Sequence, residues 1–315
     1  MPSVAGAESY HRGMERKARS TERWRLRGRS LELGVRTQVM GVVNITPDSF
    51  SDGGLFLDSE KALCYALRLL DEGADLLDLG AESTRPGSNA GGSEAAVSAE
   101  VEQARLLPVL EGILKARPDA VISVDTYKAA TARAALNAGA EIINDVSGFT
   151  WDPSLAQVCA EFGAGAVLMH TRGRPEEWRM QPQLEPDALI ATVRDGLTAS
   201  LDAARCAGIA EDCIVLDAGY GFGKRFDENY SLLARQNELL ALGRPLLAGL
   251  SRKSFLGHTL AELYGGKPAP VEARESASLA AMTAAILNGA SIVRVHEVRG
   301  AVEAARIADA VVRAG

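Results

Sequence analysis

The 315-residue sequence has four cysteines and no long apolar run. No stretch approaches the ~18 consecutive apolar residues that span a bilayer, and no apolar core follows the first charges as in a secretory signal. We therefore expect a cytoplasmic protein with no membrane partner. Cys64, Cys159, Cys206 and Cys213 lack the paired spacing of zinc ligands, so we expect reduced packing residues and no zinc site.

Aromatic residues are also scarce, at 5% of the chain, although apolar residues make up 47%. This balance excludes a disordered chain and is typical of parallel sheets covered by Ala-rich helices. The formal charge is −7, but residues 1–37 hold nine basic and four acidic residues, so the remainder is more acidic still. We expect residues 1–22 to be a basic, disordered extension and residues 23–315 to form one catalytic domain that binds no nucleic acid.

Short β-branched or Leu-rich runs recur along residues 38–315 at intervals of about 36 residues, with helical periodicity between them. This spacing predicts an α/β fold, a (β/α)8 TIM barrel, preceded by a short hairpin at 24–33. A doubly wound sheet is the alternative, but TPDSFSDGG after the first run is not its glycine fingerprint. The eight expected strands lie at 38–44, 75–80, 121–125, 140–145, 165–170, 213–217, 245–250 and 291–296.

Nearly every expected strand is apolar until its C-terminal end, where a polar residue follows. In a (β/α)8 barrel these ends meet on one face, which carries the active site. Lys224 follows three alternating glycines like a phosphate loop, but Ala218 and Arg225 break that pattern, so we expect no nucleotide cradle. The strand-end residues are Asn44, Asp78, Asp125, Asn144, His170, Asp217, Arg252 with Lys253, and Arg294 with His296.

Eight ordered blocks of the sequence resemble the signature blocks of the dihydropteroate synthase family. The resemblance implies an enzyme that joins p-aminobenzoate to the hydroxymethyl carbon of a dihydropterin diphosphate and releases pyrophosphate. Ala81, Ala218 and Tyr220 stand where the family more often has Gly, Pro and Phe, and none of them removes a charge. The blocks are MGVVNITPDSFSDGG (40–54), AESTRPG (81–87), SVDTYK (123–128), IINDVSG (142–148), LMH (168–170), LDAGYGFGK (216–224), GLSRKS (249–254) and RVHEV (294–298).

A pterin presents a guanidine-like edge of hydrogen-bond donors beside an acceptor, so its pocket needs carboxylates and an amide. Asp125, Asn144 and Asp217 supply this set. Two other interpretations stay open, because Asp125 could cap the next helix and Asp217 could form an ion pair with Lys253. The resemblance adds Met169, Phe222, Gly249 and Lys253 to the pterin site.

The diphosphate requires positive charge. Arg294 and His296 lie two residues apart on the last expected strand and so share one face. By resemblance, Asn44 gives an oxygen to a Mg²⁺ that bridges the leaving diphosphate, as a hard cation prefers oxygen ligands. The catalytic residues are then expected to act electrostatically, with no strong base, and they are Asp125, Asp217, Lys253, Arg294 and His296.

Two Gly- and Ser-rich segments after the first two strands are expected to close over the substrates, although they could be ordinary solvent loops. The resemblance places Phe50, Asp52 and Pro86 around the aminobenzoate, and Thr84 and Arg85 at the diphosphate. It also places Arg252 and Ser254 at the aminobenzoate carboxylate, where sulfonamides are expected to compete.

Two other functions use the same barrel. A pterin-binding methyltransferase that hands a methyl group to a corrinoid protein shares the pterin carboxylates, but it needs neither the expected lid motifs nor SRKS (251–254). A catalytically silent paralogue is disfavoured because every expected charged residue is present. The resemblance further implies a homodimer through the Ala-rich helix at 275–289.

Overall fold

The structure is a computed structural model that describes residues 21–46, 54–83, 90 and 96–314, with only the backbone given for residues 54–58. Its main element is a closed barrel of eight parallel strands in the order β10-β3-β4-β5-β6-β7-β8-β9. The eight expected strands are confirmed, with ends that differ by up to two residues. They are β3 (Gln38–Asn44), β4 (Leu76–Gly80), β5 (Ile122–Asp125), β6 (Ile142–Asp145), β7 (Gly165–Met169), β8 (Ile214–Asp217), β9 (Leu246–Ala248) and β10 (Ala290–Val295).

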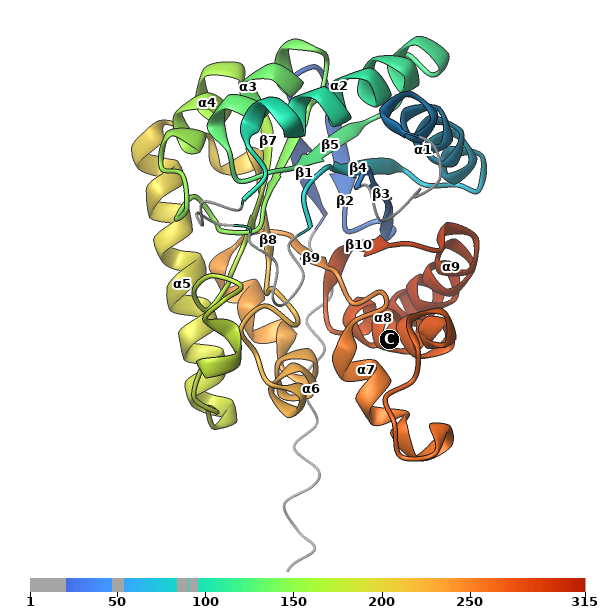
Figure 1. The fold of residues 1–315 in the computed structure, drawn as a ribbon. Coiled ribbons are helices and arrows are strands. Elements are labelled where there is room, and N and C mark those ends of the chain that lie inside the picture. The colour runs from blue at the N-terminus through green and yellow to red at the C-terminus, as the bar shows by residue number, and fades with distance from the viewer. Residues whose placement is uncertain (1–20, 47–53, 84–89, 91–95, 315) are drawn as a thin grey trace, which may run out of the picture.

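Helices form a ring around the barrel (Figure 1). Their apolar faces and the outward side chains of the strands make one continuous hydrophobic core. The helices are α1 (Gly54–Asp71), α2 (Ala99–Ala116), α3 (Ala129–Asn137), α4 (Ser154–Phe162), α5 (Pro186–Ala207), α6 (Phe226–Ala234), α7 (Ser254–Thr259), α8 (Glu275–Leu287) and α9 (Val298–Ala314). Short 3-10 turns lie at Trp178–Met180, Glu211–Cys213, Gln236–Leu242, Ala261–Tyr264 and Val271–Arg274.

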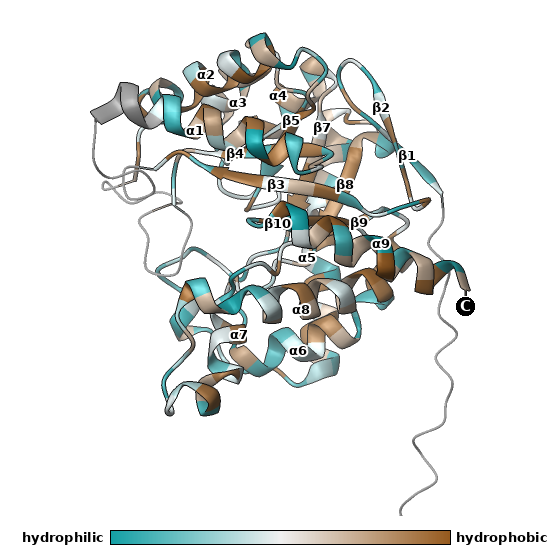
Figure 2. Ribbon diagram, turned by 90° about the vertical axis from the view of Figure 1, so that its right-hand side faces the viewer, coloured by the Kyte–Doolittle hydropathy of each residue, from teal (hydrophilic) through white to brown (hydrophobic). Residues whose placement is uncertain are grey.

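The expected hairpin precedes the barrel and covers the amino ends of its strands. Strands β1 (Glu22–Arg25) and β2 (Ser30–Leu33) pair antiparallel, and Figure 2 shows them at one end of the barrel. Trp24 is 1% exposed and donates from Nε1 to the Cys213 carbonyl at 2.8 Å. Leu26 and Leu33 pack with the inward side chains of the barrel strands, so the hairpin closes this end and leaves the opposite end for a site.

Among the described residues, no helix is both long enough and apolar enough to cross a membrane.

Candidate active site

A buried carboxylate, Asp78 on β4, is the centre of a polar cluster inside the barrel. Asp78 is 0% exposed, and its Oδ1 accepts from Ser123 Oγ at 2.6 Å. Its Oδ2 accepts from Asn144 Nδ2 at 3.0 Å and from Arg294 Nε at 2.6 Å. Arg294 also donates from Nη2 to Asp125 Oδ2 at 2.8 Å. One guanidinium therefore joins two carboxylates inside the barrel. Hydrogen bonds between oppositely charged groups such as these are stronger than those between neutral groups.

The strand register explains this cluster. In parallel pairing, Asp78 on β4 lies beside Ser123 on β5, and Asp125 lies beside Asn144 on β6. Successive side chains of a strand point to opposite faces, so residues two apart face the same interior. The barrel then closes through β10, which carries Arg294 to the same interior from the other end of the chain.

Asp217, at the end of β8, forms the second half of the site with Lys253. Its Oδ1 accepts the Gly219 backbone N–H at 2.7 Å, while the Lys253 ammonium lies over the Phe222 ring, 4.0 Å from its centroid. A Cβ added to Gly249 would lie 3.9 Å from Asp217 Oδ2 and 3.9 Å from Arg294 Cβ. Glycine at this position thus keeps the space between the two charged residues open.

The sequence also allows an ion pair between Asp217 and Lys253. No such pair occurs among the ion pairs of the described residues. The Lys253 ammonium instead makes a cation–π contact, worth about 0.5–2 kcal/mol according to its desolvation. Both charged groups therefore keep hydrogen-bonding capacity for a ligand.

Burial shifts the pKa values of these groups in opposite directions. Burial raises the pKa of Asp125 to about 7, with Arg294 opposing the rise and Asp78 adding to it. Burial also raises the pKa of Asp217, against the Gly219 N–H and the nearby lysines. The pKa of Lys253 is lowered by burial to about 8. Groups that titrate this close to neutrality, clustered in one place, are typical of functional sites.

An apolar wall lies beside the polar cluster. Met169, at the end of β7, is 5% exposed and packs with Tyr127 and Val146. Trp151 and Phe222 pack against this group. A wall of this kind suits a flat heteroaromatic ring, since aromatic and thioether groups pack against ring faces. Met169 and Phe222 thus lie together, as the resemblance implies.

His296 and Arg252 lie near the ends of β10 and β9. His296 Nδ1 lies 3.0 Å from Ser251 Oγ. Arg252 has a left-handed backbone with φ +61°, and its N–H donates to Ser278 Oγ at 2.9 Å. Ser254 is exposed and is the first residue of α7. These three residues therefore lie at or just beyond the carboxyl ends of β9 and β10.

Asn44 ends β3 with a half-buried side chain. Within the described part of the chain, no group of three or more His, Cys, Asp or Glu side chains could hold a metal ion. A metal at this place could take one amide oxygen from Asn44 and would need the rest of its ligands from substrate and water. Mg²⁺ is commonly bound in this way in phosphate-transfer sites.

The residues expected in the two lid segments, Phe50, Asp52, Thr84, Arg85 and Pro86, lie outside the described residues. A hydrogen bond links the described residues on either side of the second expected lid segment: Glu82 Oε1 accepts the Val97 N–H at 3.1 Å. Lys128 donates to the other oxygen of Glu82.

Comparison with known proteins agrees with this geometry. The family described as pterin binding enzyme matches residues 40–296. The chain belongs to this family. It is 42% identical to the dihydropteroate synthase of Mycobacterium leprae over 280 residues, which cover 88% of this chain and 94% of the relative. Other curated relatives include the dihydropteroate synthases of Synechocystis and Escherichia coli, which are 41% and 40% identical to this chain.

Solved structures of family members have the same fold. The Yersinia pestis dihydropteroate synthase with a sulfonamide drug complex has a TM-score of 0.82 and 39% identity, covering 93% of this chain and 100% of that one. The Xanthomonas albilineans enzyme with 4-aminobenzoic acid has a TM-score of 0.81 and 40% identity, covering 93% of this chain and 98% of that one. The TIM barrel is thus the fold of the family.

Sequence reasoning missed two members of the polar cluster. Asp78 was among the polar strand residues but was given no role, and Ser123 was not considered. The available signal was the position of Asp78 between leucines in the expected strand DLLDLG (75–80). A charge in a buried strand needs a partner, and its partner Arg294 lies 216 residues away along the chain.

Proposed function

We propose that this chain condenses a dihydropterin hydroxymethyl diphosphate with p-aminobenzoate to give dihydropteroate and pyrophosphate. The observation that carries this proposal is the meeting of Asp125, Asn144 and Asp217 with Lys253 beside the Met169 wall. The family match and the dihydropteroate synthase names of the relatives support it. The enzyme is a transferase of folate biosynthesis.

The pterin is bound by hydrogen bonds at its edge and by packing at its face. Asp217 and Asp125 accept from the guanidine-like N–H groups, and Asn144 offers a carbonyl oxygen, because its amide nitrogen is engaged by Asp78 at 3.0 Å. Lys253 donates to the carbonyl and ring-nitrogen side. Met169 and Phe222 contact the ring face, and Gly249 leaves space for the ring.

In the reaction, the nitrogen lone pair of aminobenzoate forms a bond to the pterin methylene carbon as the bond from that carbon to the diphosphate oxygen breaks. The amine nitrogen then loses one proton to solvent. Asp125 and Asp217 stabilise positive charge that develops on the pterin. Removing one group of this kind typically costs about 2.7–4 kcal/mol of barrier.

The leaving diphosphate is assigned to Arg294, His296, Thr84, Arg85 and Asn44. Arg294 donates its Nε hydrogen to Asp78 and one Nη2 hydrogen to Asp125. A guanidinium has five N–H donors, so three remain for phosphate oxygens. When bound, Mg²⁺ would supply further positive charge to the diphosphate, with Asn44 as its protein ligand.

The aminobenzoate is assigned to Arg252, Ser254, Phe50, Asp52 and Pro86. The Yersinia pestis structure contains a sulfonamide drug and the Xanthomonas albilineans structure contains 4-aminobenzoic acid, and in this chain we assign both ligands to the same site. We also propose that the protein is a cytoplasmic homodimer. Residues 1–22 take no part in turnover in this proposal.

Pyrophosphate release from dihydropterin diphosphate and p-aminobenzoate tests the function directly. We expect turnover by the wild-type protein and a loss of about a hundredfold or more in kcat/KM for Asp125→Asn and for Asp217→Asn. Asp212→Asn, an exposed site beside the hairpin, is the matched control and is expected to retain full activity. Methyl transfer from a methylated folate without pyrophosphate release would instead identify the methyltransferase.

A further inference from the structure

Gly219, Gly221 and Gly223 alternate in the loop of residues 218–224, between β8 and α6, and their pattern does not match a phosphate loop. The structure shows that these glycines have a different role. Gly219 and Gly223 have φ values of +71° and +70°. A Cβ on Gly219 would overlap the carbonyl oxygen of His170, and one on Gly223 would lie 2.7 Å from Arg172 Cβ. The glycines thus let the loop pack tightly against the end of β7.

Inside this loop lies the ammonium of Lys224. The side chain donates to the carbonyls of Gly219 at 2.8 Å, His170 at 3.2 Å and Phe222 at 3.3 Å. The residue is only 7% exposed. An ammonium has three donors, so every one has an acceptor within the protein. The loop therefore encloses the Lys224 amine, which has no donor left for a phosphate.

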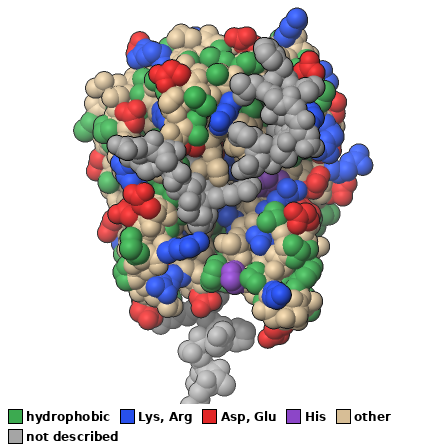
Figure 3. All heavy atoms as spheres, in the orientation of Figure 1, with side chains coloured by type: hydrophobic (Ala, Val, Ile, Leu, Met, Phe, Trp, Pro, Cys, Tyr) green, Lys and Arg blue, Asp and Glu red, His purple; other side chains and the backbone are tan. Residues whose placement is uncertain are grey.

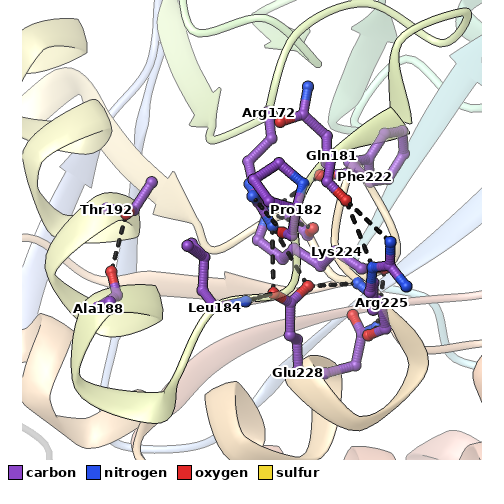
Figure 4. A network of polar contacts seen from close by, with 12 residues as sticks. Arg172, Gln181, Pro182, Leu184, Ala188, Thr192, Phe222, Lys224, Arg225 and Glu228 are labelled. Atoms are coloured by element: carbon purple, nitrogen blue, oxygen red, sulfur yellow. Dashed lines mark hydrogen bonds and ion pairs between the residues drawn. The ribbon is translucent and has the colours of Figure 1, made fainter. Parts of the chain in front are cut away.

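The 218–224 loop is also held by hydrogen bonds to the start of α6. Asn229 on α6 accepts the Gly221 N–H at 2.7 Å, and Glu228 accepts the Arg225 N–H at the start of the same helix. Glu228 also pairs with Arg172, as Figure 4 shows. Lys224 and α6 thus hold the loop through different backbone groups.

The backbone groups that Lys224 holds belong to residues that touch the site. Gly219 donates its N–H to Asp217 Oδ1 at 2.7 Å. Phe222 presents its ring to the Lys253 ammonium at 4.0 Å. We propose that Lys224 is a positioning residue, which fixes the Gly219 N–H against Asp217 and the Phe222 ring under Lys253, and so sets the shape of the pterin pocket.

This role rests on the proposed pterin substrate and differs from catalysis, since Lys224 is enclosed by carbonyls. Removing the Lys224 amine should allow the Phe222 ring and the Asp217 carboxylate to adopt more orientations. Ground-state and transition-state binding of the pterin would then weaken by the same amount, which raises KM and leaves kcat nearly unchanged. A general loss of stability would act oppositely, because a smaller folded fraction lowers the apparent kcat and leaves KM alone.

The test compares Lys224→Met, which keeps the length of the side chain without its donors, with wild type and with Lys115→Met on the exposed face of α2. We expect Lys224→Met to raise KM for dihydropterin diphosphate about tenfold, with kcat changed by less than about threefold. Calorimetric affinity for 6-hydroxymethylpterin should fall by the same factor. Lys115→Met should match wild type in all three quantities.

A fall in kcat at unchanged KM, or an unchanged pterin affinity, would overturn the assignment. Where Lys224→Met does not fold, Lys224→Gln replaces it, and failure of both to fold would show that Lys224 stabilises the whole barrel rather than this pocket. A wild-type protein that releases no pyrophosphate would refute the proposed function, and the pterin titration would still decide the role of Lys224.

Discussion

At the residue scale, a single guanidinium sets the electrostatics of the site. Burial lowers the pKa of Arg294, but Asp78 and Asp125 outweigh that effect and raise it, so Arg294 stays charged. Asp78 is fully buried and has donors on both oxygens, whereas the Asp125 side chain is 21% exposed. Asp78 thus orients Arg294, and Asp125 is the carboxylate that a ligand can reach.

The raised pKa of Asp125 predicts how pterin binding depends on pH. Asp125 has a pKa of about 7 in the free protein, so it is mainly ionised only above that pH. Pterin N–H groups favour the ionised carboxylate, and the affinity for 6-hydroxymethylpterin should therefore fall roughly tenfold per pH unit below about pH 7. Calorimetric titration between about pH 6 and pH 8 measures this.

Asp125→Asn should bind the pterin weakly throughout this range and show no such pH dependence. Asp212→Asn should keep the wild-type profile, since Asp212 pairs with Arg25 beside the hairpin. An identical acid limb in Asp125→Asn would assign the titration to another group.

At the scale of elements, stability and function are divided between the two ends of the barrel. The hairpin β1–β2 closes the amino ends with Trp24, Leu26 and Leu33. The loops after β8 and β9 supply Phe222, Gly249 and Lys253 at the other end. In Figure 3, basic and acidic side chains are both spread over the face shown, and some of the basic ones lie near its middle.

Truncating the hairpin tryptophan should therefore lower stability without changing the site. Trp24→Ala removes a side chain that is 1% exposed and leaves the Cys213 carbonyl without its donor at 2.8 Å. We expect the free energy of unfolding to fall by about 3–5 kcal/mol in urea titrations. Trp24→Phe, which keeps an aromatic ring, should lose less.

Both variants should keep the wild-type KM values for the two substrates. A changed KM for either substrate would mean that the hairpin influences the carboxyl ends of the strands, contrary to the separation described above.

At the scale of the whole molecule, α8 and α9 pack together on one side of the barrel (Figure 1). The outer face of α8 has small side chains, with Ala280 exposed and Ala277 and Ala284 half-buried. A face of small residues lets a second helix approach closely. This is the face that the proposed homodimer would use.

Ala280→Arg should convert the proposed dimer to a monomer, because a guanidinium in a packed interface of small side chains has no partner and costs several kcal/mol to desolvate. Sedimentation velocity measures the change in mass. Ala203→Arg, at an exposed position of α5, is the control and should remain dimeric. A monomeric wild-type protein, or a dimeric Ala280→Arg, would refute this interface.

The sequence by itself determined the barrel and predicted a site at the carboxyl ends of its strands. The regular spacing of apolar runs is a local property of the chain, and each strand needs only its own pattern to be recognised. Polar residues such as Asp125, Asn144 and Asp217 could be found because each ends an apolar run. Their roles came from the resemblance to a family, since chemistry depends on which groups meet.

Tertiary structure alone decided which of these residues touch. Asp78 meets Arg294 because the barrel closes between β10 and β3, and no local pattern encodes that closure or its register. Lys224 turns inward to three carbonyls because the loop packs against the end of β7. The sequence shows only a lysine after three glycines, and the direction of its side chain depends on packing between segments more than fifty residues apart.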